Sequence, residues 1–251
     1  METQKKSSIE KAIIIMELMG REPYEYTAQQ ISENTGFNIA TVYRIIYQLE
    51  EYHFVDLDEN SKCYRVGPSM YQIGAKYLYN NTYMDKLQNI LDEISEICKE
   101  SVGLAVLDGD KIISVIEIEV HQPMKMNDVP GKYFQPNKGN YGKCITAFRD
   151  ESDVERYLDA HTFEKTYPAT LTEKDELLAE YKKIRKQGYS ESVDELGIDI
   201  LGTGIPLFNK DNRIWGCVSI AFFREDGWEE KLSAMRKLLF VYKDKIEQYL
   251  P

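Results

Sequence analysis

Residues 27–67 constrain the fold of this chain more than any other stretch, because their cap and turn residues divide them into two short helices and a hairpin. The threonine that opens the stretch can cap a helix over residues 28–34, since its hydroxyl can accept a hydrogen bond from a free first-turn amide. Gly36 can end that helix in the left-handed conformation. Asn38 can then cap a second helix over residues 39–52. The spacing therefore predicts two helices joined by a tight turn.

A hairpin after these helices and a helix before them complete the unit. Residues 54–58 and 63–66 alternate apolar and polar side chains around the turn-forming residues 59–62. An amphipathic segment over residues 8–19 has a serine at its start and Gly20 after its end, which predicts a first helix. This is the arrangement of a winged helix-turn-helix, whose second motif helix enters the major groove of DNA.

The charge of the chain sets a condition on DNA binding. The formal net charge of the 251 residues is −11, and residues 1–66 contain seven Lys and Arg against eleven Asp and Glu, a formal charge of −4. Affinity for DNA depends largely on neutralising phosphates with Lys and Arg. Such a domain must gather its few cations on one face, or bind as a dimer or larger oligomer that multiplies the contacts.

The sequence does not support several other classes of protein. Nothing approaches the ~18 consecutive apolar residues of a membrane helix, and the N-terminus lacks the apolar core of a signal peptide. The four cysteines are scattered without a CxxC pair, which is typical of a cytoplasmic chain with reduced thiols. A Walker loop and the HExxH, GxSxG and GxGxxG motifs are absent from the sequence. We therefore expect a cytoplasmic protein that is not an enzyme, has no cofactor or metal, and does not bind membranes.

A second domain is expected over residues 82–251, joined to the first domain, residues 1–67, by a linker helix over residues 68–81. The linker begins with a proline, which suits the first turn of a helix, and its tyrosine-rich apolar stripe is a candidate dimer contact. The alternation of strands and helices in the second domain predicts an α+β fold. The predicted strands are 102–108, 111–120, 200–207 and 213–223, and the predicted helices are 83–100, 142–148, 151–158, 172–187 (capped by Thr172) and 229–249, with a loop over 121–140.

Four segments together resemble the IclR family, the isocitrate-lyase-regulator type of bacterial transcription factor. They are SSIEKAIIIMELM, TGFNIATVYRIIYQLEEYHFVDLDENSKCYRVGPSMYQIG, GLAVLDGDKIISVIEIEVHQPMKM and LLAEYKKIRKQGYSESVDELGIDILGTGIPLFNKDNRIWGCVSIAF, and their order covers nearly the whole chain. The resemblance implies an N-terminal winged helix-turn-helix and a C-terminal GAF-like domain that binds a small-molecule effector, here expected to be an organic acid. It also implies binding to double-stranded operator DNA by homodimers or homotetramers.

By that resemblance, the start of the second motif helix contacts DNA, through Ile39, Ala40, Thr41, Tyr43 and Arg44. The family commonly has Lys-Ser where this chain has Ile39-Ala40, and these apolar side chains could touch a thymine methyl but cannot donate to phosphates. For Arg44 the alternative to a phosphate or guanine contact is a surface ion pair, and Tyr43 could instead be part of the core. The other candidate phosphate contacts are Lys5, Lys6, Arg21, Lys62 and Arg65.

The resemblance also implies an effector site at a helix start whose free amides accept a ligand carboxylate. The matching stretch, residues 137–143, contains a glycine-rich start that suits an anion. The residues carried over to this site are Gly139, Asn140, Tyr141, Asp194, Gly202, Ser219 and Ala221. Gly202 stands where many members have a Cys, and Ala221 where a hydroxyl is common. Fewer polar side chains favour a larger or more apolar ligand, such as an aromatic acid.

Two sets of charged residues have more than one interpretation. Glu117, Glu119 and His121 alternate along one predicted strand and could bind a metal, although a solvated strand face is the simpler interpretation. Lys138 and Lys143 flank the predicted helix start and could face an anion or solvent.

Two alternatives concern a cysteine and the chain as a whole. Cys144 lies near a helix start, where thiolates are favoured, but a buried small hydrophobe is the simpler interpretation. The acidic balance leaves open a winged-helix protein-interaction module without specific DNA binding.

Overall fold

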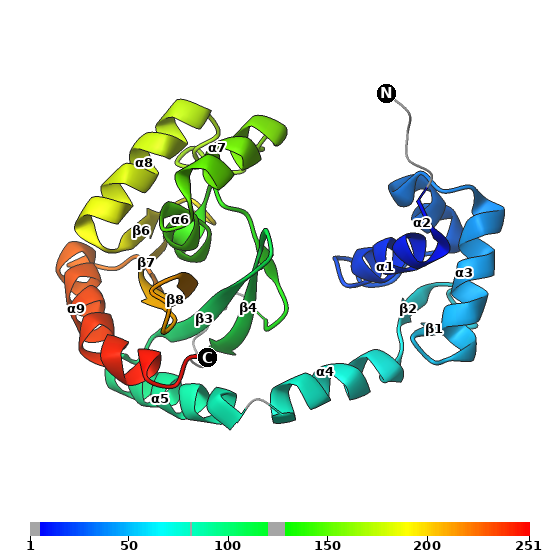
Figure 1. The fold of residues 1–251 in the computed structure, drawn as a ribbon, viewed down its shortest axis with the longest axis horizontal. Helices are drawn as coiled ribbons and strands as arrows, with labels where there is room; N and C mark the ends of the chain where they lie inside the picture. The colour runs from blue at the N-terminus through cyan, green and yellow to red at the C-terminus, as the bar shows by residue number, and fades with distance from the viewer. Residues whose placement is uncertain (1–5, 81, 120–128) are drawn as a thin grey trace. The chain divides into compact units, whose positions relative to one another are not determined.

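The computed structural model describes residues 6–80, 82–119 and 129–251, and the chain divides into two compact units, Met1–Thr82 and Tyr83–Pro251 (Figure 1). Each unit is described by itself. Among the helices of the described residues, none has the length and apolar character that a membrane crossing requires.

The first unit is a winged helix-turn-helix followed by one further helix (Figure 1). Its elements are α1 Ser8–Met19, α2 Ala28–Thr35, α3 Ile39–Glu51, β1 Val55–Leu57, β2 Tyr64–Val66 and α4 Pro68–Asn80. The antiparallel pair β1–β2 is the wing, and an isolated bridge between Tyr26 and Tyr64 joins the wing to the start of α2. The predicted motif is confirmed, with helix ends that differ from the expected ends by a residue.

Short-range caps explain why these helices begin and end where they do. Thr27 and Gln30 form a reciprocal capping box at the start of α2. Gly36 ends α2 with φ of 70°, a conformation in which a side chain would be strained. The side-chain Oδ1 of Asn38 accepts from the Ala40 amide at 2.8 Å and caps the start of α3. The buried faces of the helices then meet in one core, which includes Ile15, Met19, Ile31, Val42, Ile46 and Val55.

Helix α4 occupies residues 68–80 of the predicted linker, and residue 81 lies outside the described residues. Two side chains of the expected apolar stripe are exposed in the single chain, Tyr71 to 81% and Ile73 to 57%. These two side chains are therefore not covered by the unit that carries them.

The second unit is built on a six-stranded antiparallel sheet in the order β5-β4-β3-β8-β7-β6. The strands are β3 Ser101–Asp108, β4 Lys111–Ile118, β5 Tyr133–Phe134, β6 Ser190–Val193, β7 Ile200–Phe208 and β8 Ile214–Phe223. The helices are α5 Thr82–Cys98, α6 Gly139–Ala147, α7 Glu151–Ala160, α8 Lys174–Gln187 and α9 Trp228–Glu247. This α+β arrangement is the GAF-like fold expected from the sequence.

The two faces of the sheet are covered by different helices (Figure 1). On one face, Leu104 and Val218 pack with Leu87 of α5 and Leu239 of α9 in the largest core cluster. On the other face α6 packs on the central strands, and α8 packs in turn on the end of α6. Helix α6 is thus enclosed between the sheet and α8, and all nine of its residues are buried.

Four local predictions were wrong in this unit. The predicted loop 121–140 contains β5, and β6 was not expected at all. Helix α6 begins at Gly139 rather than at residue 142. Thr172 does not cap α8, which begins at Lys174, because Glu173 occupies the N-cap position.

Candidate functional site

Helix α6 begins with backbone conformations that only glycine provides without strain. Gly139 has φ of 72°, and a Cβ there would lie 2.8 Å from Leu196. One turn later, a Cβ at Gly142 would lie 1.9 Å from the Gln135 carbonyl oxygen. Gly139 therefore takes its left-handed conformation against the Leu196 side chain, and Gly142 lets the helix approach the Gln135 backbone.

The expected anion position at this helix start is filled by the chain's own carboxylate. The Gly139 amide donates to Glu195 Oε2 at 2.8 Å, and both residues are buried. A carboxylate is favoured there because the amide points outward and the helix dipole is positive at this end. In this structure, then, the Gly139 amide is not free for a ligand.

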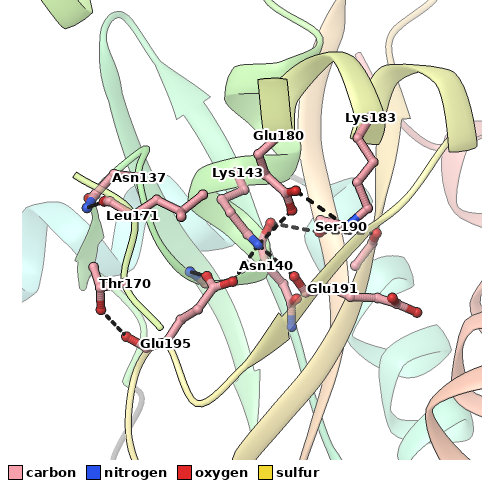
Figure 2. A network of polar contacts seen from close by, with 12 residues as sticks. Asn137, Asn140, Lys143, Thr170, Leu171, Glu180, Lys183, Ser190, Glu191 and Glu195 are labelled. Carbon is pink, nitrogen blue, oxygen red and sulfur yellow. Dashed lines mark hydrogen bonds and ion pairs between the residues drawn. The ribbon is translucent and has the colours of Figure 1, made fainter. Parts of the chain in front are cut away.

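The same glutamate belongs to a buried charge network around Lys143 (Figure 2). The Lys143 side chain is 2% exposed, and its ammonium donates to Glu195 Oε1 at 2.6 Å, Glu180 Oε1 at 3.0 Å and the Glu191 carbonyl at 2.7 Å. Burial raises the pKa of Glu195. Burial is also the largest single influence on Glu180, but the combined attraction and hydrogen bonds of Lys143 and Lys183 outweigh it and lower the pKa of Glu180. Lys143 therefore fixes α6 to α8 and to the segment after β6.

Beside α6 lie two adjoining cavities that share Phe134, Asn140, Leu196 and Ala221 as walls. The smaller, about 40 Å³, contains two glutamates, and we call it the acidic cavity. The larger, about 350 Å³, contains two lysines, and we call it the basic cavity. The acidic cavity is further lined by Ser101, Gly103, Glu117, Ile118, Glu119, Tyr141 and Ser219, and the basic cavity by Lys132, Tyr133, Gln135, Lys138, Ser192, Ile200, Leu201 and Gly202. The larger volume is within the usual range for small-molecule sites.

Small residues on the central strands leave room for these cavities. Gly103 pairs with Glu117 on β4 and with Ser219 on β8, so it lies in the middle of the floor. A Cβ at Gly103 would lie 1.9 Å from the Tyr141 hydroxyl oxygen and 2.2 Å from Glu117 Oε2. A Cβ at Gly202 would lie 2.4 Å from Asn140 Nδ2. Any larger residue at either position would displace polar groups of the site.

Polar atoms of the cavity walls have unused hydrogen-bonding capacity. Asn140 Nδ2 donates to Ser219 Oγ at 3.0 Å, and the Tyr141 hydroxyl donates to Glu117 Oε2 at 3.3 Å. The buried wall atoms without a hydrogen-bond partner in the described part of the chain include Asn140 Oδ1, Glu119 Oε1 and Ser192 Oγ. Buried polar atoms are usually satisfied, so a ligand or water is needed to complete them.

Lys138 is the cation of the basic cavity nearest to the start of α6. Its ammonium donates to Thr166 Oγ1 at 3.1 Å, and burial lowers its pKa. Burial disfavours the charged form of the ammonium because it removes water. A nearby anion favours the charged form, so an anion bound beside Lys138 would be stabilised.

The structure brings together most, but not all, of the residues predicted for the effector site. Asn140, Tyr141, Gly202, Ser219 and Ala221 all line the cavities. Gly139 and Asp194 are not among the described lining residues. Gly139 is bonded to Glu195, and the Asp194 carboxylate forms an ion pair with Arg224 and accepts from the Asp199 amide at 2.8 Å.

Sequence reasoning did not place Phe134, Ser192 or Leu196 in the site. Each lies on a short edge strand or in the segment after one, and no local pattern in the sequence marks them. Lys138 faces the basic cavity, whereas Lys143 points into the charge network. The prediction that Cys144 is buried is confirmed, since its exposed fraction is 0%.

The possible metal ligands Glu117, Glu119 and His121 are only partly covered by the structure, because His121 lies outside the described residues. Over residues 6–80, 82–119 and 129–251, no three His, Cys, Asp or Glu side chains form a group that could hold a metal ion. Glu117 and Glu119 face the acidic cavity together.

The candidate DNA-binding face is the exposed side of α3. Ala40, Tyr43 and Arg44 are exposed there, and Tyr43 is exposed to 54%. Thr41 is half-buried, and Ile39 is half-buried against the helical core. The reading face therefore presents an aromatic ring and a guanidinium beside apolar surface.

Cations around this face are partly engaged by acids of the same unit. In the wing, Lys62 Nζ lies 2.6 Å from Glu59 Oε2, and this hydrogen bond raises the pKa of Lys62. Arg65 lies 3.9 Å from the Glu25 carboxylate. Arg21 is exposed, the Lys6 ammonium lies 5.8 Å from the centre of the Phe37 ring, and Lys5 is outside the described residues.

Comparison with known families decides the identity of this architecture. The IclR helix-turn-helix domain matches residues 8–59, and the C-terminal domain of the bacterial transcriptional regulator IclR matches residues 75–247. The chain belongs to the IclR family. It is thus a DNA-binding transcriptional regulator with an effector-binding C-terminal domain.

Individual IclR-family relatives are similar over nearly the whole chain. The HTH-type transcriptional regulator KdgR of Escherichia coli (strain K12) is 25% identical over 240 residues, which cover 96% of this chain and 91% of KdgR. The crystal structure of an IclR transcriptional regulator from Alicyclobacillus acidocaldarius has a TM-score of 0.85 at 23% identity and covers 99% of this chain and 100% of its own. An IclR homolog from Microbacterium hydrocarbonoxydans, complexed with 4-hydroxybenzoate, has a TM-score of 0.78 at 14% identity, with coverage of 97% and 99%.

Proposed function

We propose that this IclR-family regulator changes its affinity for operator DNA when a small organic acid occupies the two cavities beside α6. A 350 Å³ cavity with lysines and an unsatisfied serine hydroxyl is the observation that carries this proposal. The acid would place its carboxylate near Lys138 and Ser192, and its body against Phe134 and Leu196. The 4-hydroxybenzoate bound by the Microbacterium relative supports an acid of that size.

Operator binding would use the exposed start of α3 in the major groove. Arg44 and Tyr43 would make polar contacts, Thr41 and Ala40 would contact base edges or methyls, and Ile39 would hold the helix against its core. Arg21, Lys62 and Arg65 would bind phosphates, with Lys62 and Arg65 exchanging their present carboxylate partners for the DNA backbone.

A single copy offers few cations, so DNA binding would require a homodimer or homotetramer. Exposed apolar side chains on α1 and α4 support self-association: Ile9 is 74% exposed, and Tyr71 is 81% exposed. Helix α4 connects the two units along the chain, so effector binding in the second unit would act on the paired recognition helices through it. Such a regulator would work in the cytoplasm and would not catalyse a reaction.

The test measures binding of the full-length protein to the DNA upstream of its own gene by fluorescence anisotropy across a salt series. We expect affinity to fall steeply as salt rises, because counterions are released from phosphates. Acids of benzoate size should shift the curve in one direction, whereas a neutral isostere such as benzamide should not. Equal curves with and without every acid tested would contradict effector control.

The competing proposal, a protein-interaction module, makes a different prediction for the same titration. Such a module would show no binding to that DNA at low salt and no salt dependence. Multi-angle light scattering on the free protein measures its oligomeric state, and a strictly monomeric protein would contradict the oligomeric regulator.

A further inference from the structure

The two adjoining cavities differ in the sign of the charges that line them. Glu117 and Glu119 line the acidic cavity, and no Lys or Arg is among the described residues that line it. Lys132 and Lys138 line the basic cavity, and no Asp or Glu is among its described lining residues. A ligand that carried only a carboxylate would complement one cavity and be disfavoured in the other.

The sizes of the cavities assign different parts of a ligand to each. About 350 Å³ holds the body of a small molecule, whereas about 40 Å³ holds little more than a group the size of a water molecule. An aromatic ring does not fit the acidic cavity, but a terminal ammonium or hydroxyl does. Phe134 and Leu196 belong to both cavities, so an apolar middle part would pass between them.

The unsatisfied atoms of the acidic cavity are acceptors rather than donors. Glu119 Oε1 and Asn140 Oδ1 are buried without a hydrogen-bond partner among the described residues, and Asn140 is only 7% exposed. An ionised carboxylate can only accept hydrogen bonds, and an ammonium supplies three donors together with the opposite charge. A neutral hydroxyl supplies one donor and no charge.

We propose that the effector is a zwitterion, with a carboxylate in the basic cavity and a protonated amine in the acidic cavity beside Glu117 and Glu119. Its aromatic or aliphatic middle part contacts Phe134 and Leu196. This inference rests on the proposed function, in which an acid binds these cavities, and adds the chemistry of its other end.

The test compares matched acids by titration calorimetry with the full-length protein. The pairs are 4-(aminomethyl)benzoate against 4-methylbenzoate and 6-aminohexanoate against hexanoate, and 4-(hydroxymethyl)benzoate is added as a neutral donor. We expect the amine of at least one pair to bind about tenfold more tightly than its partner, the effect of a charged hydrogen bond. The hydroxymethyl acid should resemble the methyl acid.

Two substitutions test whether the tighter binding of the amine arises at the acidic cavity. Glu119→Gln should remove the roughly tenfold advantage of the amine and leave the affinity for the methyl acid within about twofold. Asp226→Asn removes one exposed charge that is not among the described lining residues of either cavity, and it should leave the advantage intact.

Each other outcome overturns a defined part of the inference. Equal affinity within both pairs would overturn the zwitterion and leave an acid effector standing. Equal affinity for the aminomethyl and hydroxymethyl acids would overturn the requirement for charge. An advantage that survives Glu119→Gln would overturn the assigned place, and binding of none of the acids would count against the proposed function as well.

Discussion

Helices α3 and α6 both begin at a candidate binding surface, yet their first turns are held in different ways. Asn38, immediately before α3, accepts from the Ala40 amide at 2.8 Å, and the exposed turn stays accessible to a partner. Glu195 accepts from the Gly139 amide of α6, also at 2.8 Å, from 56 residues further along the chain. The start of α3, with its local cap, therefore stays at the surface. The start of α6, capped by a residue far along the chain, is buried, and only the side that faces the cavities can contact a ligand.

The largest expected effect follows from removing the cation that supports the long-range cap. Lys143→Met would leave the buried Glu195 without its ammonium and would leave Glu180 paired with the exposed Lys183. We expect the free energy of unfolding of the second unit to fall by about 3–5 kcal/mol, the usual cost of breaking a buried ion pair. Both tryptophans of the chain, Trp215 and Trp228, belong to this unit, so urea titration followed by tryptophan fluorescence measures it.

Lys183→Ala is the matched control, because Lys183 also pairs with Glu180 but is 60% exposed. An exposed pair contributes little, so the control should lie within about 0.5 kcal/mol of the parent protein. Equal losses in the two variants would show that burial of Lys143 does not set its importance.

The difference between the two helix starts also explains which parts of the structure could be predicted from the sequence. The α3 region depends on caps and turns within a few residues, such as Thr27 with Gln30 and the left-handed Gly36, so its helices could be predicted. The alternation of Glu117 and Glu119 likewise predicted that both point to one side, and both line the acidic cavity, although Glu119 follows the end of β4.

The environment of α6 could not be predicted in the same way. Strand β5 has two residues and pairs with β4 alone among the strands that the structure describes, so it is too short to give a periodic pattern in the sequence. Glu195 and Leu196 lie between β6 and β7, and Glu195 is 56 residues from Gly139, so no local pattern near Gly139 indicates their contacts with it. A glycine-rich helix start therefore predicted an anion, but not that the anion would be a residue of the same chain.

A smaller effect is expected when the cavity floor under α6 is filled. In Gly103→Ala the new methyl would collide with the Tyr141 hydroxyl and Glu117, since its carbon would lie 1.9 Å and 2.2 Å from their oxygens. Overpacking of this kind costs about 1–3 kcal/mol, and it would displace the acidic cavity's own groups. Urea unfolding followed by tryptophan fluorescence measures the loss of stability. Calorimetric titration with an organic acid measures the change in ligand affinity.

Gly109→Ala offers a comparison for Gly103→Ala, because no atom lies within 4 Å of the added carbon but φ is 60°. It should lose some stability through backbone strain and should keep its ligand affinity. Unchanged ligand affinity in Gly103→Ala would contradict the role of the floor.

The local cap of α3 should matter less than the buried network. Asn38→Ala removes the acceptor for the Ala40 amide, and loss of such a cap costs about 1 kcal/mol. Far-ultraviolet circular dichroism during urea unfolding, compared with the tryptophan signal of the second unit, locates the change in the first unit. Asn34→Ala, at an exposed position in α2, should change stability by less than about 0.5 kcal/mol, and a loss as large as that of Asn38→Ala would contradict a specific capping role.

The smallest predicted effect concerns the exposed wing of the first unit, where Lys62 is paired with a neighbouring acid. Glu59→Gln would release Lys62, whose ammonium now lies 2.6 Å from the Glu59 carboxylate, and would also remove one negative charge near DNA. Because exposed ion pairs are weak, we expect operator affinity to rise by only about two- to fivefold at moderate salt. Glu33→Gln removes an exposed charge from α2 without releasing a lysine, so an equal rise in both variants would assign the effect to net charge instead of to Lys62. A rise confined to Glu59→Gln, with a steeper dependence of affinity on salt, would show that the wing gains a phosphate contact.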